Sequence, residues 1–197
     1  MKPYDISKII AAVWNPKEEV EKLDHYSGNT VFLLSSDLVN LGNHIKKIKK
    51  MGLKVFLDID FCEGLGNGEY AFRYSTLQGV DGIITVKPKM IEIANSYGVP
   101  NVLRSFALDS NSLLRINEML TNINPMFLEI LPGSAFPKVY DYLKANGLKT
   151  DNMIAAGLIE TAHETLNLFK CGAKAISTSK TQLWQLEDDK DENNERH

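Results

Sequence analysis

Short apolar runs alternate with longer amphipathic stretches along the chain. The apolar runs, which predict buried strands, span residues 9–13, 30–34, 54–60, 82–86, 101–107, 126–131, 153–158 and 175–179. The stretches between them have the apolar spacing of helices and include residues 17–26, 37–51, 88–97, 112–121, 136–145 and 162–170. Several of these stretches precede a glycine, which readily takes the left-handed conformation that ends a helix; these are Gly28, Gly52, Gly79, Gly98, Gly147 and Gly172.

Strict alternation of strands and helices predicts a parallel sheet. Eight units favour closure into a single α/β domain of the (β/α)8 type, the TIM barrel, over residues 1–186. Such barrels typically take about 250 residues, so a chain of 197 residues must have short loops. An open, doubly wound sheet would carry a glycine-rich nucleotide motif after its first strand, and the segment AVWNP at residues 12–16 is not one.

Charge is distributed unevenly. The whole chain carries −3 and the tail 187–197 carries −4, so residues 1–186 carry +1. The tail lacks apolar residues and is expected to be disordered. No apolar run is long enough for a membrane span or a secretory signal, and two cysteines make no disulfide framework, so we expect a cytoplasmic protein. The four histidines lack the spacing of a zinc site, so no metal is expected.

Charged residues fall on the inward side of the predicted strands. Side chains alternate between the two faces of a strand, which places Asp58, Asp60, Arg104 and Glu129 inside the barrel, with Asp60 at its rim. Buried charges are costly unless they are paired or bind a ligand. They therefore predict either a ligand pocket or a structural ion-pair network, and we expect Asp60 to contact a ligand.

The last two predicted strands end in small and hydroxyl-bearing residues. Barrels often bind phosphate after strands seven and eight, through backbone N–H groups and the start of a short helix. Gly157 would let the backbone approach the phosphate, and Thr178 or Ser179 would cap the helix and donate a hydroxyl. Residues 180–186 are predicted to form that helix. The alternative is that Gly157 and Ser179 are only a turn glycine and a cap.

The second predicted helix is rich in basic residues. They are His44, Lys46, Lys47, Lys49 and Lys50. This pattern is typical of a solvated helix face, with binding of a polyanion as the alternative.

The chain resembles the glycerol-3-phosphate-responsive antiterminator family, also called glycerol uptake operon antiterminator regulatory proteins. The resemblance runs from the first predicted strand to Trp184. Its marks, in order, are Asp60 with Gly64, Arg104 with Phe106, Asp109, EILPG at 129–133, AGLI at 156–159, and residues 175–179 followed by Leu183 and Trp184. Two departures are Ala156, where a second glycine is expected, and Gln182, where a lysine is expected.

The resemblance implies a non-enzymatic regulator that senses glycerol 3-phosphate and, with ligand bound, acts on the leader mRNA of glycerol operons to let transcription pass a terminator. By this resemblance Gly157, Thr178 and Ser179 would hold the phosphate, and Asp60, Arg104 and Glu129 would line the pocket near the glycerol hydroxyls. It implies no cofactor besides this ligand and leaves open whether the chain forms a homodimer. The RNA surface is not implied, and the only candidate in the sequence is Lys46, Lys47, Lys49 and Lys50.

An enzyme acting on a phosphorylated triose is the alternative function. Asp58, Asp60 and Glu129 would then serve as acid and base, or hold a divalent cation. Lys87, which follows the fourth predicted strand, would form a Schiff base.

Overall fold

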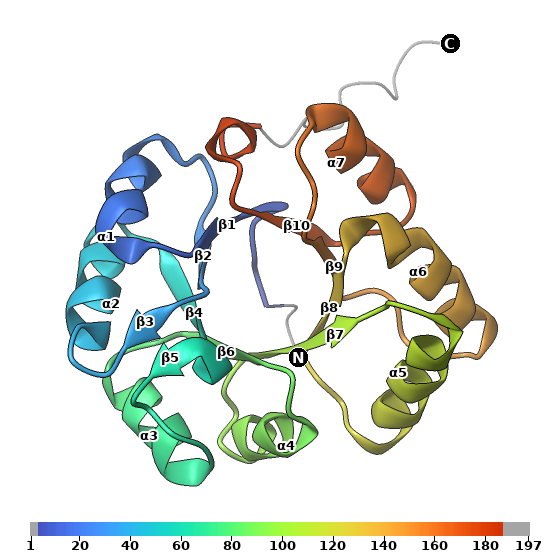
Figure 1. The fold of residues 1–197 in the computed structure, drawn as a ribbon, viewed down its shortest axis with the longest axis horizontal. Helices are drawn as coiled ribbons and strands as arrows, with labels where there is room; N and C mark the ends of the chain where they lie inside the picture. Colours follow the sequence, from blue (N-terminus) through green and yellow to red (C-terminus); the bar gives the residue numbers. More distant parts are fainter. Residues whose placement is uncertain (1–3, 187–197) are drawn as a thin grey trace.

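Eight parallel strands form a closed ring with helices around the outside (Figure 1). In the computed structural model, which describes residues 4–186, the ring strands are β1 Ile9–Val13, β2 Thr30–Leu33, β4 Lys54–Asp58, β6 Gly82–Thr85, β7 Asn101–Phe106, β8 Phe127–Leu131, β9 Met153–Ala156 and β10 Ala175–Thr178. Each pairs with its neighbours in chain order, and β10 pairs with β1 to close the ring. The predicted single (β/α)8 barrel is confirmed. The predicted acidic tail, residues 187–197, lies outside the described residues.

The helices on the outside are short. They are α1 Pro16–Glu19, α2 Leu41–Lys50, α3 Glu69–Leu77, α4 Pro88–Ser96, α5 Ser110–Asn122, α6 Phe136–Ala145 and α7 Ala162–Lys170. The first predicted helix is an α-helix for only four residues and continues as the 3-10 helix η1, Val20–His25. The sequence reading did not identify α3, nor the two-residue strands β3 Ser36–Asp37 and β5 Cys62–Glu63, which pair with each other outside the ring.

The two faces of the ring strands separate two apolar layers. Inward residues such as Phe32, Phe56 and Phe127 form one buried cluster inside the barrel. Residues one position along, such as Leu33 and Leu57, belong to the larger cluster between strands and helices. The predicted alternation is therefore confirmed, and it also sets which polar side chains on these strands point into the barrel.

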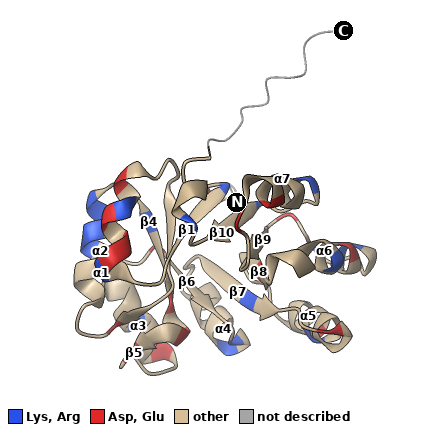
Figure 2. Ribbon diagram, turned by 45° about the horizontal axis from the view of Figure 1, so that its top comes forward, with Lys and Arg blue, Asp and Glu red and all other residues tan. Residues whose placement is uncertain are grey.

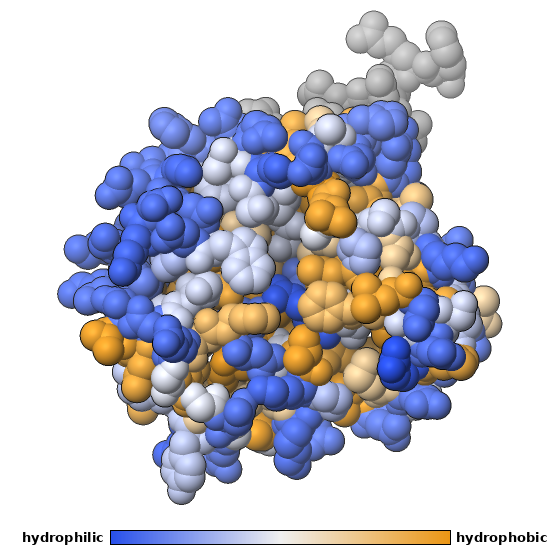
Figure 3. All heavy atoms as spheres, in the orientation of Figure 1, coloured by the Kyte–Doolittle hydropathy of each residue, from blue (hydrophilic) through white to orange (hydrophobic). Residues whose placement is uncertain are grey.

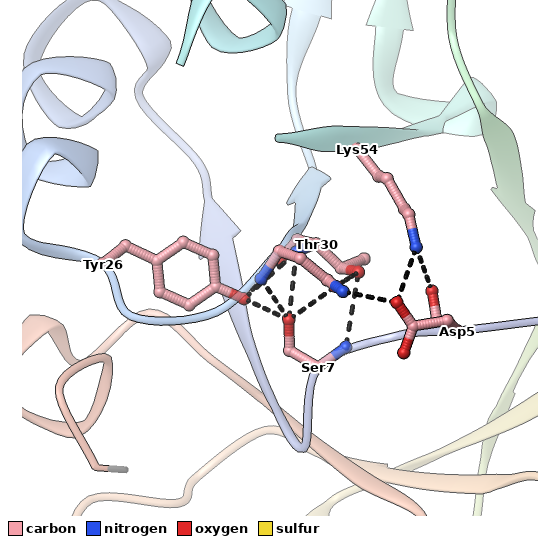
Figure 4. A network of polar contacts seen from close by, with 6 residues as sticks. Asp5, Ser7, Tyr26, Thr30 and Lys54 are labelled. Atoms are coloured by element: carbon pink, nitrogen blue, oxygen red, sulfur yellow. Dashed lines mark hydrogen bonds and ion pairs between the residues drawn. The ribbon is translucent and has the colours of Figure 1, made fainter. Parts of the chain in front are cut away.

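The segment before β1 closes the barrel at the N-terminal ends of the strands. Tyr4 packs edge-on against Phe56 and Phe127 of the interior, with ring centroids 5.9 and 6.5 Å apart. At the same end of the barrel, the Tyr26 hydroxyl oxygen lies 2.7 Å from the carbonyl oxygens of Ile9 and Thr30. It belongs to the polar network with Ser7 and Thr30 that Figure 4 shows. Because this end is filled, space for a ligand inside the barrel is at the opposite, C-terminal end.

The prediction that Gly28 takes the left-handed conformation is wrong. Of the six glycines expected in the left-handed conformation, Gly52, Gly79, Gly98, Gly147 and Gly172 have positive φ, and Gly28 does not. A Cβ at Gly28 would lie 2.3 Å from the Tyr26 hydroxyl oxygen and 2.6 Å from Ser7 Oγ. The glycine is needed here for space beside the Tyr26 network, and not for backbone conformation.

Candidate functional site

A cavity of about 280 Å³ opens at the C-terminal end of the barrel. Its walls are residues 156–160, from the end of β9 into the following loop, and residues 177–180, from the end of β10 into the following loop. Trp14 lies on the β1 side, and Arg104 and Glu129 lie inside. Figure 3 shows this face of the molecule, with apolar side chains around a central hollow. Pockets for small ligands typically measure about 300–1,000 Å³, so the cavity fits a ligand of few atoms.

Three charged side chains meet inside the barrel beneath this cavity. Arg104 Nε donates to Glu129 Oε2 at 2.5 Å, and its Nη1 donates to Asp58 Oδ2. All three side chains are at most 4% exposed. The structural ion-pair network that the sequence left as an alternative is therefore present, and two of its members, Arg104 and Glu129, also line the cavity.

The network holds one more negative than positive charge. Burial raises the pKa of Asp58 to about 6, although Arg104 opposes this shift. Glu129 is fully buried, and its second oxygen, Oε1, has no hydrogen-bond partner among the described residues. A buried carboxylate oxygen without a donor is costly. Because Glu129 lines the cavity, a ligand with a hydroxyl group would supply the missing donor.

Asp60 lies apart from this cavity. The strand ends at Asp58, and Asp60 sits in the 3-10 turn η2, Ile59–Phe61. Its carboxylate accepts from Thr85 Oγ1 at 2.9 Å and Val86 N at 2.8 Å, and pairs with Lys87 Nζ at 2.9 Å. Asp60 is not among the described residues that line the cavity, and neither is Lys87, the candidate for a Schiff base.

The three residues expected at the phosphate all line the cavity, in different ways. Gly157 has φ +76°, and the next residue, Leu158, is also left-handed. Ser179 is exposed. The Thr178 hydroxyl is used within the loop, since it donates to Ile159 O at 3.2 Å and accepts from Lys180 N at 3.1 Å. Thr178 thus joins the two loops, which holds the cavity wall in place.

The final segment is anchored as expected but is less helical. Leu183 and Trp184 are buried, and Trp184 Nε1 donates to Thr178 O at 2.8 Å. The only helical part of the predicted 180–186 helix is a three-residue 3-10 turn, η4 Thr181–Leu183. Ala156 points to the interior and lines the cavity, so the methyl group that departs from the family pattern does lie on its wall.

Sequence reasoning missed three polar residues of the cavity lining. Ser177 is buried and shares the inward side of β10 with Ala175. Its alternation with Ala175 was the available signal. Glu160 and Lys180 line the mouth, and Lys180 Nζ lies 2.8 Å from Glu160 Oε1. Loop residues follow no period, so the sequence held no signal for this pair.

The basic residues of α2 lie outside the ring, away from its interior (Figure 2). Lys46, Lys47, Lys49 and Lys50 are all exposed, and Lys49 pairs with Asp81 at 2.7 Å. His44 does not belong to this surface: it is buried, with Nδ1 3.0 Å from Ser36 Oγ. None of the helices in the described part of the chain has the length and apolar character of a bilayer span.

The family model for the glycerol-3-phosphate responsive antiterminator matches residues 9–184, which is the whole barrel. The chain belongs to this family. The solved structure of a glycerol uptake operon antiterminator-related protein from Thermotoga maritima is 41% identical, with a TM-score of 0.81 over 92% of this chain and 100% of that one. The glycerol uptake operon antiterminator regulatory protein of Listeria monocytogenes is 27% identical, with a TM-score of 0.84 over 94% and 98%.

A curated relative gives no further guide to activity. The uncharacterized protein YgcP of Escherichia coli is 32% identical over 79% of this chain and 81% of its own length. The family is named for antitermination, which supports a regulatory rather than a catalytic role.

Proposed function

We propose that this protein is a non-enzymatic cytoplasmic regulator that binds glycerol 3-phosphate in the cavity at the C-terminal end of the barrel. With ligand bound, it binds the leader mRNA of a glycerol operon and lets transcription pass a terminator. The family match supports the regulatory role.

The unpartnered Oε1 of Glu129 carries the ligand assignment. It is buried at the base of a cavity whose outer walls are the loops after β9 and β10. A hydroxyl of the glycerol part would donate to this oxygen, and the phosphate would lie against Gly157 and Ser179. Carboxylates accept hydrogen bonds from a diol, whereas backbone amides and hydroxyls donate to a phosphate. Glycerol 3-phosphate carries both groups and is small.

Substituting Glu129→Gln should weaken binding of glycerol 3-phosphate by about 10- to 100-fold, since a hydrogen bond to a charged group is worth about 1.5–3 kcal/mol. Binding of inorganic phosphate, which has no glycerol hydroxyl to lose, should stay equal or improve because one negative charge is removed. Isothermal titration calorimetry with glycerol 3-phosphate, glycerol and inorganic phosphate measures both effects.

The exposed Glu118→Gln on α5 is the matched control and should change neither affinity. Thermal unfolding of each variant checks that the barrel is intact. Equal losses for glycerol 3-phosphate and inorganic phosphate would remove Glu129 as the hydroxyl acceptor. A wild-type protein that binds all three compounds equally weakly would contradict the ligand itself.

The basic surface of α2 is our candidate for the RNA contact. Its four lysines are all exposed, and they gather on the outer side of one helix (Figure 2). Lysines bind RNA through its phosphates, and each contact releases counterions, so affinity falls as salt rises. Residues 1–186 carry a net charge of only +1, so attraction to RNA phosphates would come from this local patch and not from the barrel as a whole.

Neutralising all four lysines to glutamine should weaken binding of the leader RNA and flatten its salt dependence. The slope of log K against log salt should fall by about 0.7 for each lysine that contacts a phosphate of single-stranded RNA. The measurement is filter binding or fluorescence anisotropy with saturating glycerol 3-phosphate. In a control variant with the same loss of charge, glutamine replaces four other exposed lysines, Lys89, Lys138, Lys170 and Lys174. An unchanged slope in the α2 variant would exclude this surface.

A further inference from the structure

Two charged side chains face each other at the mouth of the cavity. Glu160 follows β9 and Lys180 follows β10, and their Oε1 and Nζ atoms are 2.8 Å apart. Both residues line the cavity. Their side chains are 61% and 43% exposed, so the ion pair is solvated and contributes little to stability. Breaking it therefore costs little.

The interior of the cavity offers no spare cation to an anionic ligand. Arg104 is bound by both Asp58 and Glu129, which leaves that network with an excess negative charge. Among the described residues that line the cavity, the lysines and arginines are Arg104 and Lys180 alone. A phosphate dianion entering the mouth thus meets a negative interior, and Lys180 is the cation within reach of the mouth.

The backbone of Lys180 is held while its side chain is exposed. Its N–H donates to Thr178 Oγ1 at 3.1 Å, and Thr178 O accepts from the buried Trp184 at 2.8 Å. A lysine side chain has four flexible methylene groups and ends in a point charge. Its ammonium can therefore turn from Glu160 to a neighbouring anion while the main chain stays in place.

We propose that Lys180 exchanges partners: it pairs with Glu160 when the cavity is empty and with the phosphate when glycerol 3-phosphate is bound. This inference rests on the proposed function and adds two specificity-determining residues to its site. Glu160 acts as a resident competitor for the cation. A dianion attracts Lys180 more strongly than a single carboxylate does, whereas a neutral ligand such as glycerol gains nothing from it. The pair thereby selects phosphorylated ligands.

Calorimetry with glycerol 3-phosphate on single and double variants tests the exchange. Lys180→Gln should weaken binding about 10-fold or more, in line with the loss of a charge-assisted contact. Glu160→Gln should tighten it about 2- to 5-fold, because the competitor is gone. In the Lys180→Gln background the gain from Glu160→Gln should largely vanish. Lys180→Arg should retain binding, and Lys89→Gln, which breaks the exposed Lys89–Glu92 pair elsewhere, should leave affinity unchanged.

Two results would overturn the exchange while leaving the proposed function standing. One is wild-type affinity in Lys180→Gln. The other is an equal gain from Glu160→Gln with and without Lys180, which would mean that Glu160 acts by simple repulsion. A wild-type protein that gives no binding heat and no thermal shift with glycerol 3-phosphate would overturn the proposed function, and the exchange with it.

Discussion

Replacing Arg104 by methionine should lower the free energy of unfolding by about 3–5 kcal/mol, the usual cost of leaving buried charge without its partner. Arg104 is the shared partner of Asp58 and Glu129, and all three side chains are buried inside the barrel. Methionine fills similar space but carries no charge. Two carboxylates would then lie unpaired in an apolar interior, and a large part of the roughly 5–15 kcal/mol that typically stabilises a protein would be lost.

The loss of unfolding free energy in Arg104→Met should increase as the pH rises. Without Arg104, which opposes the shift, the pKa of Asp58 rises further in the folded state, beyond its value of about 6 in the intact network. The folded variant then binds more protons than the unfolded chain above about pH 4, so its stability falls as the pH rises from there. The deficit relative to the wild type should be smallest near pH 4 and grow toward pH 8. Urea unfolding of variant and wild type between pH 4 and pH 8 measures it.

Arg115→Met is the matched control. Arg115 is exposed and lies 3.8 Å from Asp109, so its loss should cost less than about 0.5 kcal/mol. If Arg104→Met were as stable as Arg115→Met at pH 7, then Arg104 would not be needed to compensate the buried carboxylates of Asp58 and Glu129, and the prediction would be wrong.

Substituting Ser179→Asp should weaken binding of glycerol 3-phosphate by about 100-fold or more. The substitution places a carboxylate on the cavity wall where the proposed phosphate lies, and like charges in contact cost several kcal/mol, with about 1.4 kcal/mol for each tenfold change. Ser179 is exposed, so the barrel itself should fold normally. Calorimetry gives the affinity, and thermal unfolding without ligand verifies the fold.

Two further variants separate charge from other effects. Ser179→Ala removes only a hydroxyl and should cost about tenfold at most. Ser96→Asp adds the same charge at the end of α4, away from the cavity lining, and should leave binding unchanged. Comparable binding by Ser179→Asp and the wild type would place the phosphate elsewhere on the protein.

Much of the fold could be predicted because strand patterns are local. Each ring strand is buried on both sides, so its run of apolar residues stands out from the amphipathic helices. Because side chains alternate between the two faces of a strand, the sequence also predicted that Asp58, Arg104 and Glu129 point inward. The pair of β3 with β5 was missed because each strand has only two residues, too few to show an alternation. Helix α3 is as long as α4 and α7, but its only buried apolar residues are Ala71 and Phe72, so its apolar face is weak in the sequence.

The chain alone therefore determined the barrel and the inward side of its strands, since alternation is a property of extended backbone. Tertiary structure decided which inward charges line the cavity. Asp60 was expected beside Asp58, but the backbone leaves the extended conformation after Asp58, whose side chain accepts from Asp60 N at 3.2 Å. Alternation ends there, and Asp60 turns to Lys87. Ring closure and the loops after β9 and β10 bring Glu129, Ser179 and Lys180 to one cavity, because contacts between distant segments are set by packing and not by local pattern.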